Sequence, residues 1–191
     1  GDPDLPLDPD GTIADMGCFY FDQTDTESPT INIDYISESV GTNDDLLVNW
    51  TASDNMALDS AFIYYSTDSL TSMKLIAIMQ SEDEVIGEYL FTVPDSVVAD
   101  YAAFIINVFD NAGNSSSDTS NFFSIFDNTS PEVVVLTPSD GFSIPENELF
   151  TVSWSHSDNI SIFDHLFEYS SDGINYDTLL HEIIYELKII N

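Results

Sequence analysis

The chain has 191 residues, of which 35 are Asp or Glu and only 2 are Lys or Arg, giving a formal net charge of −33. This charge balance excludes a nucleic-acid-binding protein, which must neutralise phosphates, and it disfavours contact with anionic membrane surfaces. The sequence also lacks an uninterrupted apolar stretch of about 18 residues, so insertion into a membrane is not expected. The acidity favours surroundings rich in calcium or salt, whose ions screen repulsion between carboxylates, and the alternative is an acidic secreted protein without a bound ion.

Cys18 is the single cysteine, so no disulfide can form within the chain. We interpret it as a small buried hydrophobic residue rather than as a reactive thiol. The sequence begins on Gly-Asp-Pro without a recognisable secretory signal peptide. We therefore expect the chain to be part of a longer protein, whose other domains are its first partners.

Residues 1–25 are rich in proline and aspartate, which predicts a short extended segment with turns. Two motifs in it, DPDGT at 8–12 and ADMGCFY at 14–20, resemble the closing segment of right-handed parallel β-helix (pectin-lyase-like) surface proteins. The resemblance implies a β-helix upstream of this chain. Cys18 departs from the pattern, which has a small residue such as alanine there.

The same segment carries candidate calcium ligands, Asp8, Asp10 and Asp15. Gly11 permits a tight turn between them, and calcium takes several carboxylate oxygens at once. The alternative is an acidic leader without a bound ion.

A motif then occurs twice, as WTASDN at 50–55 and WSHSDN at 154–159, with an offset of 154 − 50 = 104 residues. Apolar and polar residues alternate before each tryptophan, which predicts a half-buried strand. The Ser-Asp-Asn that follows predicts a turn, because Asp and Asn side chains bond to their own backbone, and a second strand follows the turn. The residues predicted to face inward are Leu46, Val48, Trp50, Leu58, Ala61, Ile63 and Tyr65 in the first copy, and Phe150, Val152, Trp154, Ile162, His165, Phe167 and Tyr169 in the second.

These strands and the later motif FDNAGNS at 109–115 resemble bacterial surface Ig-like and fibronectin type III-like modules. The resemblance covers residues 28–191 and implies an all-β fold of tandem β-sandwiches. It carries little information about function, because such sandwiches serve many roles.

The first module is expected at 28–128, after a polar linker at 23–28. The pattern predicts seven strands between about 29 and 127, including one near 102–108 that is apolar on both faces and therefore central. Pro94 ends the strand before it, since proline cannot donate to a β-ladder. Further strands are predicted to start at Ile31, to span 73–79 and 89–93, and to end the module at 122–126.

The second module is expected at 129–191, where Ser130-Pro131 repeats Ser28-Pro29. It has 191 − 131 + 1 = 61 residues against 127 − 29 + 1 = 99 in the first module. We therefore predict that it is incomplete and that its last three strands are absent. A gene fragment is the simplest explanation, and a natural domain completed by a partner strand is the alternative.

Asp54, Asp110 and Asn114 are the candidate calcium ligands of the first module. In the seven-strand order their two loops lie at the same end of the sandwich, where their oxygens suit a hard cation. The alternative is that these residues only stabilise turns. Asp158 and Asn159 repeat the first loop in the second module, without the second loop.

Catalytic motifs are not recognisable in the sequence. His156, His165 and His181 lack the spacing of metal ligands, and there is no nucleophile elbow, P-loop or glycine fingerprint. We therefore expect a non-catalytic adhesion or spacer module of a secreted or cell-surface bacterial protein, with a surface protein or a polysaccharide as its partner. The alternative is an accessory region of a secreted polysaccharide-degrading enzyme whose active site lies on the upstream β-helix.

Overall fold

The computed structural model describes residues 6–7, 11, 13, 24–80, 87–143, 145 and 147–183. Within these residues all secondary-structure elements are β-strands, so the predicted all-β class is confirmed. The candidate ligands Asp8, Asp10 and Asp15 lie outside the described residues, as does most of the β-helix-like segment. The chain divides into two compact units, the first comprising Gly1–Val40, Asp44–Thr92 and Ala99–Ile125 and the second Gly41–Asn43, Val93–Val98 and Phe126–Asn191.

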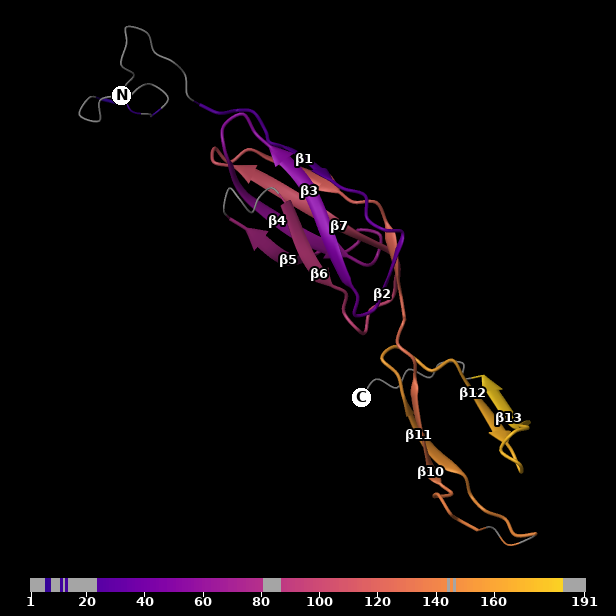
Figure 1. Ribbon diagram of the computed structural model, residues 1–191. Helices are drawn as coiled ribbons and strands as arrows, with labels where there is room; N and C mark the ends of the chain where they lie inside the picture. Colours follow the sequence, from indigo (N-terminus) through magenta and orange to yellow (C-terminus); the bar gives the residue numbers. More distant parts are fainter. Residues whose placement is uncertain are drawn as a thin grey trace. The chain divides into compact units, whose positions relative to one another are not determined.

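Two sheets build the first unit (Figure 1). One sheet has the order β1-β3-β6, and the other has the order β2-β9-β7-β4-β5, with β8 also paired to β7. The strands are β1 (Thr30–Ile33), β2 (Ser39–Gly41), β3 (Asp45–Ser53), β4 (Leu58–Ser66), β5 (Lys74–Met79), β6 (Gly87–Thr92), β7 (Ala99–Asp110), β8 (Ser115–Thr119) and β9 (Phe123–Phe126).

The inner face of β3 follows the predicted alternation. Val48, Trp50 and Ala52 are buried. Leu47, which precedes them, and Thr51, which lies between the last two, are exposed. A strand with period-two hydrophobicity buries one face and leaves the other in water. The register pairs Trp50 with Ile33 of β1 on one side and with Gly87 of β6 on the other, so the tryptophan lies on the central strand of its sheet.

β4 and β7 form the middle of the opposite sheet. Leu58, Ala61, Ile63 and Tyr65 of β4 are buried as predicted, and a register shift between Leu58 and Ser60 also turns Ser60 inward. β7 pairs with β4 along one edge and with β8 and β9 along the other. This central place explains why its apolar run is buried on both faces.

Aromatic side chains join the two sheets. The Phe91 ring of β6 lies 4.8 Å from that of Tyr65 and 5.3 Å from that of Phe104, which belong to the other sheet. Phe104 also stacks on Phe123 at 5.6 Å. These contacts close the core between the sheets, and burial raises the pKa of the Tyr65 hydroxyl to about 12.

The prediction of seven strands between 29 and 127 is wrong, because the described part of this range contains nine. β2 has three residues, too few for a periodic pattern to be recognised. β8 has the sequence SSSDT and carries no hydrophobic alternation, although it pairs with β7 over five residues. Pairing with a central neighbour therefore creates strands that local sequence does not predict.

The second unit contains two two-stranded sheets, β10-β11 and β12-β13. Their strands are β10 (Glu132–Thr137), β11 (Ser153–Ser157), β12 (Asp164–Tyr169) and β13 (Asp177–Ile183). The strand predicted to include Phe150 and Val152 begins instead at Ser153, and both residues are exposed. The pairing of Val135 with Trp154 repeats the pairing of Ile33 with Trp50, so this part of the repeat is preserved in the backbone.

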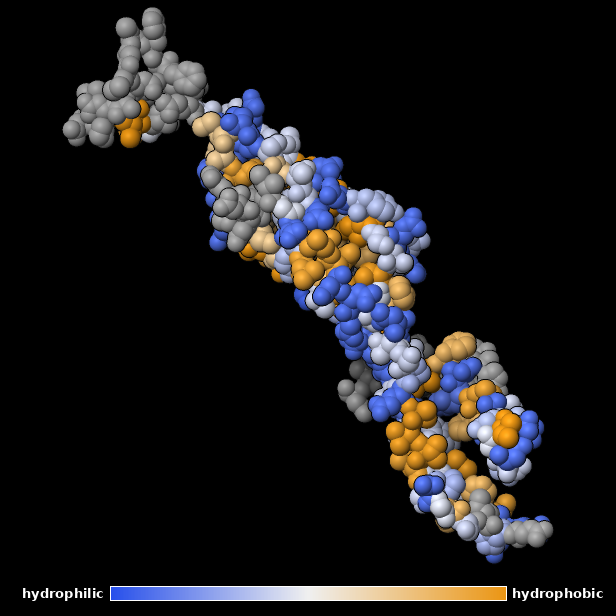
Figure 2. Space-filling model, in the orientation of Figure 1, coloured by the Kyte–Doolittle hydropathy of each residue, from blue (hydrophilic) through white to orange (hydrophobic). Residues whose placement is uncertain are grey.

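Apolar surface is much more exposed in this unit than in the first. Val133 and Val135 of β10 are 66% and 63% exposed, and Figure 2 shows hydrophobic side chains at the surface along β10 and β11. Trp154 is half-buried, whereas Trp50 is 2% exposed. The two tryptophans thus occupy equivalent strand positions but very different surroundings.

Candidate metal centre

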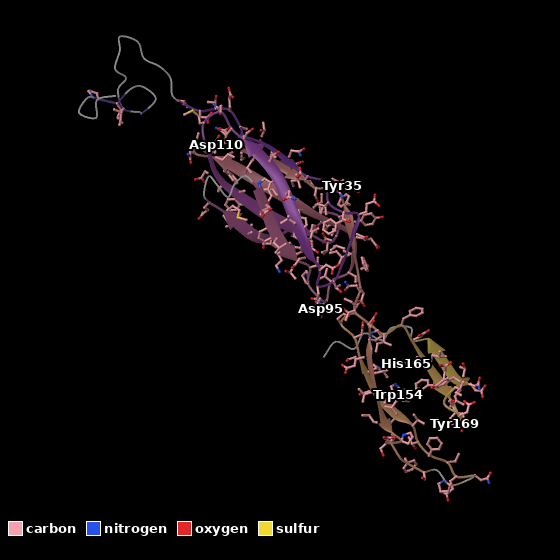
Figure 3. All side chains as sticks on the ribbon, viewed as in Figure 1. Tyr35, Asp95, Asp110, Trp154, His165 and Tyr169 are labelled. Atoms are coloured by element: carbon pink, nitrogen blue, oxygen red, sulfur yellow. The ribbon has the colours of Figure 1, made fainter. Side chains whose placement is uncertain are left out.

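Three carboxylates meet at one end of the first unit. Asp25 lies in the segment before β1, Asp54 in the turn between β3 and β4, and Asp110 at the end of β7. Each offers an oxygen that lies within 4.8 Å of the other two. Asp110, labelled in Figure 3, is buried, and Asp25 and Asp54 are half-buried.

Turn chemistry fixes Asp54 and Asp25. The Oδ2 of Asp54 accepts the backbone N–H of Met56 at 3.0 Å, which is the Asx turn expected of Ser-Asp-Asn. The Oδ1 of Asp25 accepts the backbone N–H of Glu27 at 3.0 Å and an N–H of the Asn55 side chain at 3.2 Å. Each carboxylate keeps its second oxygen, Oδ1 of Asp54 and Oδ2 of Asp25, buried without a hydrogen-bond partner.

Asn114 holds Asp110. Its backbone N–H donates to Oδ1 of Asp110 at 2.8 Å, and its side-chain amide donates to Oδ2 at 2.8 Å. Burial raises the pKa of Asp110, but the hydrogen bonds from Asn114 and from the backbone N–H groups of Gly113 and Ala112 outweigh it, so the pKa lies below its ordinary value. Asp110 is therefore a carboxylate, held in place for a cation or for the turn itself.

The loop after β7 depends on Gly113, whose φ of +92° lies in the left-handed region that favours glycine. This turn brings Asn114 back toward the end of β7, where its amide also lies 3.4 Å from the backbone carbonyl of Asp25. The motif read from the sequence as FDNAGNS thus joins the end of β7 to the segment before β1.

Three negative charges this close repel one another unless a cation lies between them. The chain contains no arginine, and its two lysines are Lys74 and Lys188. Two of the carboxylates also present buried oxygens that no protein group satisfies, and such groups are rare in native structures without a bound ion or water. The arrangement can therefore hold a metal ion.

The predicted residues Asp54 and Asp110 are brought together here, and Asn114 lies beside them. Asn114 donates its amide to Asp110, so its observed role is to position that carboxylate. Asp25 was expected to be part of a polar linker and was missed. A signal for it exists: Asp25 stands three residues before Ser28-Pro29, as Asp127 stands three residues before Ser130-Pro131.

The repeat forms similar turns in the second unit. The Oδ2 of Asp158 accepts the backbone N–H groups of Ile160 at 3.1 Å and Ser161 at 2.9 Å, and its Oδ1 is buried without a partner. Asp127 accepts the backbone N–H of Thr129 at 3.0 Å, as Asp25 accepts that of Glu27. Among the described residues, however, only the Asp25, Asp54 and Asp110 group brings three such ligands together.

No model of a known protein family matches the chain, and no curated protein is significantly similar to it in sequence. The described residues include no helix that is long and apolar enough to cross a membrane.

Proposed function

We propose that the chain is a non-catalytic adhesion or spacer module of an extracellular or cell-surface protein, and that one calcium ion bound by Asp25, Asp54 and Asp110 stiffens it. The observation that supports this proposal is the convergence of three carboxylates from three separate segments. An ion bound there would cross-link the segment before β1 to two loops of the sandwich-like unit.

The ligand chemistry favours calcium. All three groups are carboxylates, which suit hard cations, whereas nitrogen and sulfur ligands suit transition metals. Calcium–oxygen distances of about 2.3–2.6 Å place ligands on opposite sides of the ion about 4.6–5.2 Å apart, and the three carboxylates have oxygens within 4.8 Å of one another. Magnesium demands near-ideal octahedral geometry at about 2.0–2.1 Å and usually keeps several of its waters, so it is held by one or two carboxylates rather than by a group of three.

The position of the site supports a mechanical role. Asp25 already contacts Asn55 and Asn114, one from each loop. A calcium ion would add a strong restraint at the same place and would neutralise the repulsion between the loops. Fixing the segment before β1 in this way would set the orientation of the module relative to the domain that precedes it, as a spacer requires. A surface protein or a polysaccharide remains the proposed class of partner.

Hydrogen–deuterium exchange tests this role directly. We expect calcium to slow exchange of the backbone amides at 24–28, 54–57 and 110–114 together, because one ion restrains all three segments. Asp25→Asn should remove the effect, and Asp59→Asn, which removes one exposed carboxylate of β4, should keep it. Exchange that calcium slows equally throughout the chain, or equally in both variants, would leave general charge screening as the only effect.

A further inference from the structure

Two histidine rings lie side by side in the second unit. His156 of β11 and His165 of β12 lie with ring centroids 4.6 Å apart at an interplanar angle of 45°. The two strands belong to different two-stranded sheets. Trp154 lies edge-on to His165 at 6.0 Å and contacts Phe167 at 4.3 Å, and Figure 3 shows Trp154 and His165 in the space between β11 and β12.

The internal repeat shows how unusual this pair is. The offset of 104 aligns His156 with Ala52 and His165 with Ala61, since 156 − 104 = 52 and 165 − 104 = 61. Ala52 and Ala61 are both in the core of the first unit, at 7% and 0% exposed. The second unit therefore places two imidazoles where the first places two methyl groups.

A purely structural role does not account for the polar atoms of this pair. The Nε2 of His165 is buried and has no hydrogen-bond partner, which is costly for a polar atom. His156 is exposed, so solvent and ions can reach the two rings from the side of His156. Neutral imidazole is a preferred ligand of Zn²⁺, Ni²⁺ and Cu²⁺, and metal–nitrogen bonds of about 2.0–2.1 Å allow one ion to bridge two rings at this separation.

We propose that His156 and His165 bind one divalent transition-metal ion, Zn²⁺, Ni²⁺ or Cu²⁺, with solvent completing its coordination. The ion links β11 to β12 and so joins the two sheets of the second unit. The large negative charge of the chain raises the local concentration of divalent cations. The nitrogen ligands then select transition metals over calcium, which takes oxygen ligands.

The test uses the full chain in excess calcium, which occupies carboxylates that would otherwise bind the added metal. Wild type is titrated with Cu²⁺, Ni²⁺ or Zn²⁺, and bound metal is measured by equilibrium dialysis while tryptophan fluorescence is recorded. We expect one ion per chain and strong quenching by Cu²⁺ and Ni²⁺, because Trp154 lies beside His165. His156→Ala and His165→Ala should each lose the ion and the quenching.

His181→Ala is the matched control, because the strand register pairs His181 with Leu166 rather than with His165. It should bind the metal as wild type does. Alanine is the residue that the first unit carries at both aligned positions, so the two test variants introduce no side chain foreign to this fold. The proposal is overturned if either histidine variant binds like wild type, if His181→Ala loses binding equally, or if wild type binds no ion.

A second measurement does not depend on the variants folding. Zn²⁺ added to ¹⁵N-labelled wild type should shift the ring nitrogen resonances of His156 and His165 together at one equivalent and leave those of His181 in place. Shifts confined to His181, or spread equally over all three histidines, contradict the site.

Discussion

Replacing Trp50 by alanine tests whether the repeated motif builds the core of the first unit. The side chain is 2% exposed on the central strand of its sheet, with Val48 and Ala52 buried on the same face. Burying a tryptophan removes on the order of 150–250 Å² from water, which at about 25 cal/mol per Å² corresponds to roughly 4–6 kcal/mol. Large aromatic truncations in cores cost about 3–5 kcal/mol, and we expect a loss in free energy of unfolding within that range.

Urea unfolding followed by far-UV circular dichroism measures this loss, because the fluorescence of Trp50 disappears with the residue and the remaining tryptophan, Trp154, lies in the second unit. The midpoint should fall while the slope with urea stays unchanged, which is the signature of altered stability rather than an altered unfolded state. Trp154→Ala, at the aligned but only half-buried position, should leave the transition of the first unit in place. A Trp50→Ala variant that loses less than about 1 kcal/mol, as exposed substitutions do, would refute the assignment of Trp50 to the core.

Three further predictions follow from the loops and the second unit. Gly113→Ala should destabilise the chain by about 1 kcal/mol or more in urea unfolding, because φ is +92° and the added methyl meets no atom within 4 Å, so the whole cost is backbone strain. Hydrogen bonds from Ser72, and also from Ser66, hold the pKa of Asp68 below its ordinary value of 3.8 in the folded chain. The stabilisation that ionised Asp68 contributes is therefore complete above pH 3.8 and is lost as pH falls through the folded pKa. The difference in free energy of unfolding between wild type and Asp68→Ala should shrink on acidification, and a difference that stays constant would contradict the lowered pKa. Residues 130–191 alone, with exposed apolar strands such as β10, should aggregate or lack a cooperative melt while residues 24–128 melt cooperatively, and a sharp melt of the shorter piece would contradict this.

Much of the first unit could be predicted because its strands bury one face. Alternation placed Val48, Trp50 and Ile63 in the core correctly, and an uninterrupted apolar run placed β7 at the centre. The same pattern failed at Phe150 and Val152, which are exposed before β11 begins. Alternation describes a strand only where a second sheet covers it, and local sequence does not say whether that sheet is there.

The candidate metal centre could be predicted only in part, because its residues are far apart in the chain. Asp54 and Asp110 carry local turn signatures, and the antiparallel pairing of Leu58 in β4 with Asp110 in β7 brings their loops to one end. Asp25 has only the weaker signal of standing three residues before Ser28-Pro29, and its partners Asn55 and Asn114 lie 30 and 89 residues away. The histidines show no metal-ligand spacing in the sequence for the same reason, since His156 and His165 meet across two sheets rather than at a motif spacing.

The repeat also preserved more than its motif residues. Asp68 and Asp172 stand at aligned positions, and each accepts a hydrogen bond from the serine two residues before it, at 2.9 Å and 3.1 Å. Backbone N–H groups of Asn175 and Ile174 hold the pKa of Asp172 far below its ordinary value, and hydrogen bonds from the side chain and backbone of Ser72 lower the pKa of Asp68. Polar turns of this kind are specified locally, so they recur even where the surrounding packing differs.

Calcium binding by Asp25, Asp54 and Asp110 is tested most directly by calorimetric titration of the full chain, with magnesium at equal ionic strength as the reference. Binding of one calcium ion should be seen in wild type and in Asp59→Asn, and should be lost in Asp25→Asn and Asp110→Asn. The melting temperature should rise with calcium beyond its rise with magnesium, because a ligand that binds only the folded state stabilises it by mass action. Equal responses to the two ions, unchanged in Asp25→Asn, would mean that screening of the −33 charge accounts for every effect of calcium.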